Sequence, residues 1–265
     1  MKVTFVQADE NLASARLRNL IPQRELKKLG WQEGHDVIVL SKHNWSWDER
    51  IRQAFRKVVF DICDDWFDTE EWGAHYRLVS QKADLLTCNS PAMAERIREV
   101  TGRDAVVIDD PWEDPQVLPH LGDGVLWFGN KANLQDLVEA LPQIAYPLTV
   151  ISDHPAKGIT PWSLQTQQQA LRACRAVVIP TGTRQCKSAN RAVTAIRAGK
   201  MAICGDLPAY REIPGLWVGN LKDGLDWVMS EDPADRVREA QAYVHERFHP
   251  KRIGRQWHET LKGLL

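Results

Sequence analysis

The sequence predicts an α/β protein of two domains, each a doubly wound parallel β-sheet with helices on both faces. Short apolar runs, typical of buried strands, alternate with segments of helical periodicity along the chain. The alternation occurs twice, once on each side of segment 110–123, which contains three prolines and no regular apolar spacing. We therefore expect a first domain over 1–115, a second over 116–248, and a closing helix over 249–265 that packs back on the first domain. A ligand would then lie in a cleft between two domains that face each other.

Five strands are expected in the first domain, because five apolar runs of strand length are bounded by polar or turn residues. These runs are Lys2–Gln7, Asp36–Ser41, Val58–Cys63, Ala83–Asn89 and Ala105–Asp109. Between them the apolar spacing predicts helices over Leu12–Leu29 with a break at Pro22, Asp48–Arg56, Trp72–Ser80 and 91–100. The last helix has Ser90 as its N-cap and Pro91 at its first position.

The second domain repeats this pattern. Its expected strands are Gly124–Phe128, Leu148–Ser152, Ala176–Ile179, Met201–Cys204 and Leu216–Val218. Its expected helices are Leu134–Leu141, Ser163–Cys174, Lys187–Ala198, 209–212, Leu221–Met229 and Asp232–Phe248, and the closing helix after this domain is expected over Lys251–Leu264. The helix Lys187–Ala198 places apolar residues at 189, 192, 193 and 196, a helical spacing, and Gly199 ends it.

The charge argues against a dedicated nucleic-acid-binding protein, because the formal net charge is only −1. It is unevenly distributed. Residues 1–122 hold 16 Lys and Arg against 21 Asp and Glu, whereas residues 123–265 hold 18 against 14. The more basic second half suits an anionic ligand there, and the acidic first half argues against a polyanion on that side.

The five cysteines and the absence of a long apolar stretch indicate a cytoplasmic protein. Three of them, Cys63, Cys88 and Cys204, lie in or at the ends of strand runs, and no C-x-x-C pair occurs, which favours reduced thiols over a zinc or redox site. No apolar run approaches the ~18 residues of a membrane span. The chain begins directly with a strand, so we expect no signal peptide.

A polar cluster surrounds the start of the helix predicted over Lys187–Ala198. It consists of Thr183, Lys187, Ser188, Asn190 and Arg191. A helix N-terminus attracts anions such as phosphates, a lysine adds a mobile charge, and an arginine can bind two phosphate oxygens. The alternative is a surface helix whose basic residues are simply solvated.

Several segments together resemble the GT-B glycosyltransferases, nearest the large family that includes glycogen synthase and many bacterial cell-surface transferases. They are ADLLTCNSPAMAERI at 83–97, VVIDDPWE at 106–113, VLWFGNKAN at 125–133, AVVIPTG at 176–182 and AIRAGKMAICGDLPAYREI at 195–213. The resemblance implies two Rossmann-like domains, with the first shortened, and hexosyl transfer from a nucleotide-diphosphate sugar such as a UDP- or GDP-sugar. It implies no permanently bound cofactor and no metal at the site.

The same resemblance implies where the donor binds. The loop Gly129, Asn130 and Lys131 would approach the diphosphate, and Ser152, Asp153 and His154 would lie near the nucleotide. The alternative for the first loop is an ordinary strand-to-helix turn. Lys131, Lys187 and Arg191 would stabilise the charge that develops on the departing diphosphate.

One departure from the family concerns two glutamates, eight positions apart, that many relatives carry. In those relatives the first contacts the donor sugar and the second the ribose. Here the two positions hold Cys186 and Thr194. The resemblance therefore leaves the donor and the stereochemical outcome open, with Lys187, Asn190 and Arg191 as replacement contacts.

The acceptor side and the catalytic base would come from the first domain. Asn11, Ser14, Arg16 and Trp66 are the acceptor-side candidates, and Arg18, Asp61, Asn89 and Ser90 are expected to line the same cleft. If the reaction inverts, a carboxylate or a histidine of the first domain should act as base, and the candidates are Asp9, Asp64 and Asp65. The alternative for the acidic segment is a solvated surface loop.

Two further functions stay open at this level. A non-catalytic protein of the same fold would bind a nucleotide sugar without transferring it, which the missing glutamates favour. A dinucleotide-dependent oxidoreductase is disfavoured because no G-x-G-x-x-G follows any strand. The acceptor is unidentified, and a modified nucleic-acid base is not excluded as one.

Overall fold

The computed structural model describes residues 1–6, 9–41, 49–154, 156–182 and 185–265. The chain divides into two compact units. Unit 1 comprises Met1–Glu113, Cys186–Ser188 and Phe248–Leu265, and unit 2 comprises Asp114–Gln185 and Ala189–Arg247. The division falls two residues before the boundary predicted after residue 115, and the closing helix groups with unit 1.

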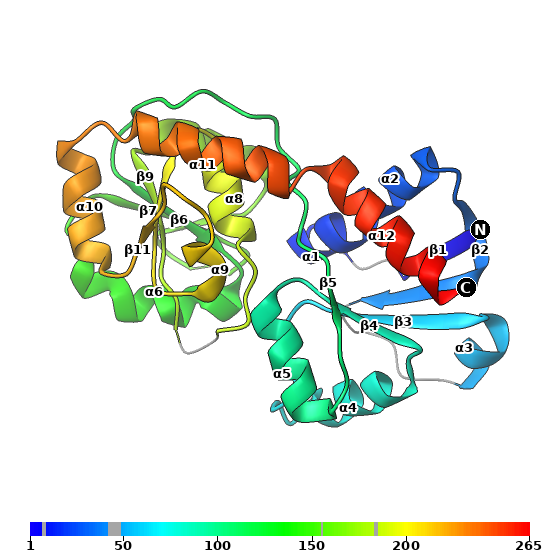
Figure 1. Cartoon of the computed structure of the whole chain (residues 1–265). Coiled ribbons are helices and arrows are strands. Elements are labelled where there is room, and N and C mark those ends of the chain that lie inside the picture. The colour runs from blue at the N-terminus through cyan, green and yellow to red at the C-terminus, as the bar shows by residue number, and fades with distance from the viewer. Residues whose placement is uncertain (7–8, 42–48, 155, 183–184) are drawn as a thin grey trace. The chain divides into compact units, whose positions relative to one another are not determined.

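Unit 1 is built on a five-stranded parallel sheet whose strands follow chain order, β1-β2-β3-β4-β5. The strands are β1 (Lys2–Phe5), β2 (Gln32–Ser41), β3 (Lys57–Ile62), β4 (Leu85–Cys88) and β5 (Val106–Val107). Helices lie on both faces (Figure 1): α2 (Ile21–Lys28) and α12 (Pro250–Leu264) on one, and α4 (Gly73–Lys82) and α5 (Pro91–Thr101) on the other. The short helix α3 (Glu49–Ala54) precedes β3.

The alternation of side chains along the strands of unit 1 creates two cores. On β2, Val37 and Val39 pack with Trp257 of α12, whereas Ile38 and Leu40 pack on the opposite face with Tyr76 of α4. Both faces are therefore buried, which is why β2 and β3 read as continuous apolar runs.

The segment that joins β1 to β2 differs from the single broken helix that the sequence predicts. It consists of α1 (Ala13–Ala15), a π-helical turn over Arg16–Leu20, and α2. Pro22 lies in the first turn of α2 without ending the helix. The extra residue of the π-turn comes just before the proline, which has no N–H to donate to the preceding turn.

Unit 2 is built on a six-stranded parallel sheet in the order β11-β10-β9-β6-β7-β8. The strands are β6 (Val125–Gly129), β7 (Leu148–Ser152), β8 (Ile159–Pro161), β9 (Ala176–Ile179), β10 (Met201–Cys204) and β11 (Trp217–Val218). From β6 the chain proceeds to one edge through β7 and β8, and then returns to build the other edge from β9. The strand order therefore reverses between β6 and β9.

The helices of unit 2 follow the predicted periodicity with one informative shift. They are α6 (Leu134–Ala140), α7 (Leu164–Ala173), α8 (Asn190–Arg197), α9 (Pro208–Arg211), α10 (Leu221–Ser230) and α11 (Ala234–Arg247). Helix α8 begins three residues later than predicted, so Lys187 and Ser188 precede it. Three-residue 3-10 turns flank α6 at Lys131–Asn133 and Leu141–Gln143.

The predicted strands are confirmed, β7, β9 and β10 to the residue, whereas β8 was not predicted. It is an edge strand of three residues that ends in a proline, so it has almost no apolar signal. Segment 114–123 contains no strand or helix, and Arg197 of α8 holds it by donating to the Asp114 carbonyl and to Gln116 Oε1.

The five cysteines are all free, and four of them are buried. Across the described residues, no helix combines the length and apolar character that crossing a bilayer requires.

Candidate anion site at the strand-order reversal of unit 2

In open α/β sheets, ligands bind beyond the carboxyl ends of the strands where the strand order reverses. Unit 2 has this point between β6 and β9. Gly129 ends β6, and the chain that leaves β9 leads to α8. A ligand site is therefore expected at Gly129 and the first turn of α8. The described strands of unit 1 follow chain order, so that sheet contains no reversal of strand order.

Gly129 and Arg191 meet at this place. A Cβ built on Gly129 would lie 3.4 Å from Nη1 of Arg191 and 3.0 Å from Cζ2 of Trp127. A larger residue at 129 would press on both side chains. The glycine thus keeps open the space beside the arginine.

The Arg191 guanidinium is only partly satisfied. It donates a hydrogen bond to the hydroxyl of Tyr210, a fully buried residue whose pKa is raised mainly by burial. Its Nη1 is buried and has no hydrogen-bond partner among the described residues. A buried cationic donor without a partner is costly, so this atom is suited to an anionic acceptor from outside the chain.

The N-terminus of α8 adds to this electrostatic preference. Its N-cap is Ala189, which makes no side-chain cap hydrogen bond, and no acidic residue lies in the first turn. The backbone N–H groups of that turn and the helix dipole both favour a negative charge, and Arg191 is the second residue of the helix.

Two further glycines allow the surrounding loops to approach one another. A Cβ on Gly182 would lie 2.5 Å from Oδ1 of Asp136 in α6. A Cβ on Gly205 would overlap the hydroxyl of Thr181. The loops after β9 and β10 are therefore tightly packed around the site, and Asp136 is a carboxylate that borders it.

The loops that follow β6 and β7 are joined by Asp153. Its Oδ2 accepts from Asn130 Nδ2 at 2.6 Å, and its Oδ1 accepts from the Lys131 backbone N–H at 2.6 Å and from Ser152 Oγ at 3.2 Å. The Asp153 carboxylate thus already accepts hydrogen bonds from Asn130 and Lys131, two residues that were expected to approach a diphosphate. A phosphate at this loop must displace that carboxylate or bind the Lys131 side chain, which is exposed.

The other predicted donor residues have different surroundings. Ser152 is fully buried, so its hydroxyl is not on the surface. Asn190 is half-buried, and its carbonyl accepts from Thr194 Oγ1 at 3.0 Å. Thr183 lies outside the described residues.

Lys187 and Ser188, together with Cys186, group with unit 1. The Ser188 side chain hydrogen-bonds to Asp110, and the Cys186 carbonyl accepts from Ser90 Oγ at 3.3 Å. Cys186 and Ser188 therefore have polar contacts in unit 1, whereas Gly129 and Arg191 meet in unit 2. Cys186 and Thr194 stand at the two positions that lack glutamates. The Cys186 thiol donates to the Ala92 carbonyl, and the Thr194 hydroxyl donates to the Asn190 carbonyl.

The three candidate bases of unit 1 are not equivalent. Asp9 is exposed, and its Oδ1 accepts from the Asn11 N–H at 2.9 Å. Asp65 forms an ion pair with Arg96 at 3.0 Å and accepts from the Phe67 N–H. Asp64 is half-buried, 3.9 Å from the Cys63 thiol.

The acceptor-side candidates of unit 1 also differ. Arg16 forms a two-bond ion pair with Glu113, at 2.7 and 3.0 Å, and Asn11 is exposed. The Ser14 hydroxyl is buried and has no partner among the described residues. Trp66 is half-buried and packs against the core beneath α4 and α5.

Four residues that were expected to line a cleft lie instead in the interior of unit 1. Arg18 and Asp61 are each 1% exposed and form a two-bond ion pair at 2.5 and 2.9 Å. Arg18 also contacts Asp110 at 3.2 Å and donates to the Ile108 carbonyl. Asn89 and Ser90 are buried as well. The expectation was wrong because the sequence could not show that the π-helical turn directs Arg18 into the sheet.

Sequence reasoning missed Tyr210, Trp127 and Asp136 at the site in unit 2. Trp127 and Tyr210 lie in segments whose pattern indicates only core packing, and Asp136 has the sequence context of an ordinary helix residue, so none of the three indicates a ligand site. Asp153, by contrast, was among the predicted residues, and it directly follows the apolar run that forms β7.

No protein-family model matches the chain, and no curated protein sequence matches it. Solved structures do match. HepE of Anabaena in complex with UDP-glucose has a TM-score of 0.65 at 15% identity, covering 98% of this chain and 85% of that chain. An alpha-glucosyltransferase in complex with UDP-glucose and DNA containing an abasic site has a TM-score of 0.68 at 8% identity, covering 98% of both chains.

TarM has a TM-score of 0.60 at 10% identity, covering 91% of this chain, which spans 57% of the TarM chain. These structures are GT-B glycosyltransferases. At such identities the likeness shows the fold, and it confirms the predicted α/β architecture of two parallel-sheet domains.

Proposed function

We propose that the chain is a glycosyltransferase that takes a sugar from a nucleotide-diphosphate donor. The observation that carries the proposal is Nη1 of Arg191, a buried cationic donor without a partner among the described residues, at the strand-order reversal beside Gly129. Structures with the same fold hold UDP-glucose, which is a ligand with an anionic diphosphate.

The chemistry of such a site follows from its charges. Breaking the bond between the anomeric carbon and phosphate leaves negative charge on the departing diphosphate. Arg191 and the uncapped N-terminus of α8 are fixed in place before the reaction, so they stabilise that charge without reorganising. Lys131 supplies a second, exposed cation at the end of β6, and the nucleotide sugar is a co-substrate rather than a resident cofactor.

The first unit would supply the acceptor and, for an inverting reaction, the base. Asp9, which is exposed, is better placed to serve as a base than Asp65, because Arg96 and the Phe67 N–H already bind the Asp65 carboxylate; Asp64 is the third candidate. Lys187 and Ser188, in the segment that precedes α8, are retained as proposed donor-binding residues. The acceptor is a hydroxyl-bearing molecule, and one structure of the same fold was determined with DNA.

Thermal shift and calorimetry with UDP, GDP, ADP, UDP-glucose and GDP-mannose test the donor site. We expect one nucleoside diphosphate to raise the melting temperature of the wild type, and Arg191→Ala to weaken its binding by about 10- to 100-fold, since a hydrogen bond to a charged group contributes roughly 1.5–3 kcal/mol. The matched control is Arg238→Ala, an exposed arginine of α11 paired with Asp235. Equal affinity of the two variants, or no shift with any nucleotide, would contradict the proposal.

A second candidate is a protein that binds the nucleotide sugar without transferring it. The observation that favours it is the replacement of two glutamates by Cys186 and Thr194, both of which bond to backbone carbonyls. Release of free nucleoside diphosphate from the donor over long incubation separates the two functions. An enzyme releases it in an Arg191-dependent manner, whereas a binding protein protects the donor.

A further inference from the structure

The outer faces of α2 and α12 gather positive charge on an otherwise acidic unit. The two helices hold seven Lys and Arg against two Glu, whereas the remainder of unit 1 holds 14 Lys and Arg against 19 Asp and Glu. The two helices pack on each other on one face of the unit 1 sheet, as Figure 1 shows. The chain therefore separates its charges by face within unit 1.

Five of these cations have no counter-ion in the part of the chain that the structure describes. They are Lys27 of α2 and Lys251, Arg252, Arg255 and Lys262 of α12, and all five are exposed. None forms an ion pair with a carboxylate of the described residues. We call these five residues the α2/α12 basic face. Of the two glutamates, Glu25 is buried and paired with Lys28 at 2.7 Å, and only Glu259 is exposed.

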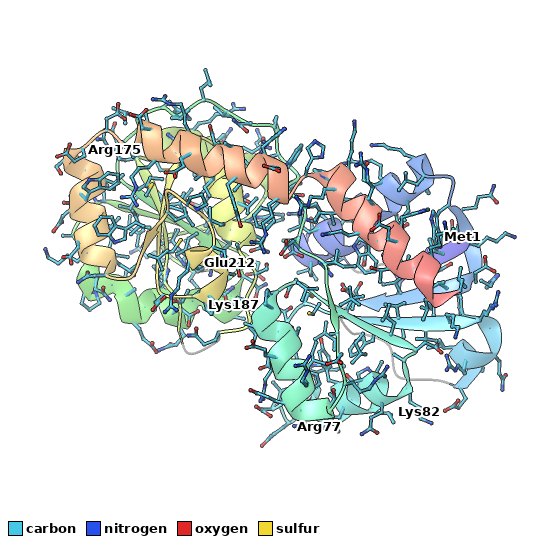
Figure 2. All side chains as sticks on the ribbon, viewed as in Figure 1. Met1, Arg77, Lys82, Arg175, Lys187 and Glu212 are labelled. Carbon is cyan, nitrogen blue, oxygen red and sulfur yellow. The ribbon has the colours of Figure 1, made fainter. Side chains whose placement is uncertain are left out.

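Elsewhere in unit 1, four exposed cations, Arg52, Arg77, Lys82 and Arg98, are paired with carboxylates, whereas exposed Lys2 and Arg56 form no ion pair with a described Asp or Glu. Arg52 pairs with Asp84, Arg98 with Asp104 at 2.7 Å, and Arg96 with Asp65. Arg77 and Lys82, labelled in Figure 2 on the side of the sheet opposite α12, pair with Asp68 and Glu49. The α2/α12 basic face is thus a local excess of positive charge rather than the general state of this surface.

We propose that the α2/α12 basic face binds the phosphate backbone of double-stranded nucleic acid, without sequence preference. Helix α12 has 15 residues and extends about 22 Å at 1.5 Å per residue, so its four cations are spread along a rigid rod. Cations in such an array replace the counter-ions of a duplex, which carries one negative charge per ~1.7 Å of its axis. This surface is separate from the donor site in unit 2.

The structure favours a duplex over a membrane or a single strand. Both helices bury their apolar side chains in the core of unit 1, among them Leu26, Ile253 and Trp257. No apolar face of these two helices therefore remains to enter a bilayer. Single strands are bound by stacking on exposed aromatic rings. Trp257 is fully buried, and Trp31 is buried and donates to His258, so the face offers no such platform.

The charge separation also revises the argument from net charge. A net charge of −1 is the sum of opposed faces, and association with a polyanion depends on the local field. The sequence gives the sum, but only the packing of α12 on α2 places these five cations together.

Fluorescence anisotropy with a labelled 20-base-pair DNA duplex of arbitrary sequence, without nucleotide, tests the proposal. For five phosphate contacts the slope of log K against log salt is about −4.5, so affinity falls roughly 500-fold between 50 and 200 mM salt. Replacing all five residues of the basic face by glutamine should abolish binding at 50 mM salt. Arg252→Gln with Arg255→Gln should reduce the slope by about 2, which keeps the test available if the fivefold variant does not fold.

The matched control replaces five paired cations, Arg77, Lys82, Arg98, Lys222 and Arg238, by glutamine, and changes the net charge by the same amount. It should retain wild-type affinity. Equal loss in both variants, tighter binding to a single strand of the same length, or binding to anionic phospholipid vesicles without binding to duplex would overturn the proposal. Since no nucleotide is present, these outcomes are independent of the donor site.

Discussion

At the residue scale, unit 1 contains a buried charge cluster that stabilises its interior rather than a cleft. Arg18 lies between Asp61 and Asp110, and Thr87 donates to Asp61 at 2.7 Å. The ion pairs with both carboxylates raise the pKa of Arg18 against the opposing effect of burial. Burial raises the pKa of the Asp110 carboxyl, and Asp61 adds to this, although Arg18 and Ser188 oppose it. The cluster therefore places two carboxylates around one guanidinium. Arg18 binds Asp61 through two hydrogen bonds and Asp110 through one contact of 3.2 Å, so Asp110 is the more weakly bound carboxylate.

This predicts a specific pH dependence for Asp110→Asn. A carboxyl whose folded pKa is raised binds more protons in the folded state, so its contribution to stability is present below the unfolded value and is lost as pH rises. Asparagine can still accept from Arg18 and Ser188 but has no charge to lose. The free energy of unfolding of the variant, relative to wild type, should therefore increase between pH 4 and pH 7 in urea titrations.

The control for that experiment is Asp84→Asn. Asp84 is partly buried, which raises its pKa, but hydrogen bonds from Arg52 and the Val58 N–H dominate and lower it. Its contribution is present above the unfolded pKa and lost as pH falls, so the relative stability of Asp84→Asn should decrease between pH 3 and pH 7. A parallel response in the two variants would refute the assignment of the raised pKa to Asp110.

At the element scale, the packing of α12 on α2 depends on one glycine. A Cβ built on Gly254 would overlap the Cβ of Glu25 and lie 3.2 Å from its Cγ, whereas a Cβ on Gly263 of the same helix meets nothing within 4 Å. Both glycines lie in α12 and neither has a positive φ. The two positions thus differ in packing but share the same secondary structure.

We predict opposite effects for alanine at the two positions. Gly254→Ala should lower the free energy of unfolding by about 1–2 kcal/mol, since overpacking exceeds the gain in helix propensity. Gly263→Ala should raise it by about 0.5 kcal/mol, because only the propensity changes. Chemical denaturation measures both, and equal stabilisation of the two variants would show that α12 does not approach α2 this closely.

At the scale of the whole molecule, the chain returns to its first unit after completing its second. Ile253, Trp257 and Leu261 of α12 belong to the core that contains Val3, Phe5 and Val37. Loss of one large buried side chain costs about 2–5 kcal/mol, and total stabilities are about 5–15 kcal/mol. Unit 1 should therefore not fold without the last 18 residues, Phe248–Leu265.

Truncation after Arg247 tests this dependence. We expect β1–β5 to lose protection from hydrogen exchange, while β6–β11 keep it, because truncation after Arg247 retains every residue of unit 2. Truncation after Lys262 keeps Ile253, Trp257 and Leu261 and removes only three residues, of which Leu264 and Leu265 are half-buried at the margin of the core of unit 1, so both sheets should stay protected. Retained protection of β1–β5 in the first truncation would contradict the assignment of α12 to the core of unit 1.

The sequence alone determined the succession of strands and helices, the parallel sheets and the candidate Arg191. These follow from local information: apolar runs such as 176–179 fix a buried strand, Ser90 with Pro91 fixes a helix start, and a basic residue near a helix N-terminus marks an anion site. The resemblance to GT-B glycosyltransferases rested on the order of such segments, and the likeness to solved structures confirms the fold.

Only the tertiary structure decided which polar residues are available. Arg18 and Arg191 are both arginines near the start of a helix, yet the π-turn buries the first between two carboxylates, and Gly129 leaves space beside an unpartnered nitrogen of the second. The partners of a charged side chain come from segments tens of residues away, so its pairing is a property of packing and not of local sequence.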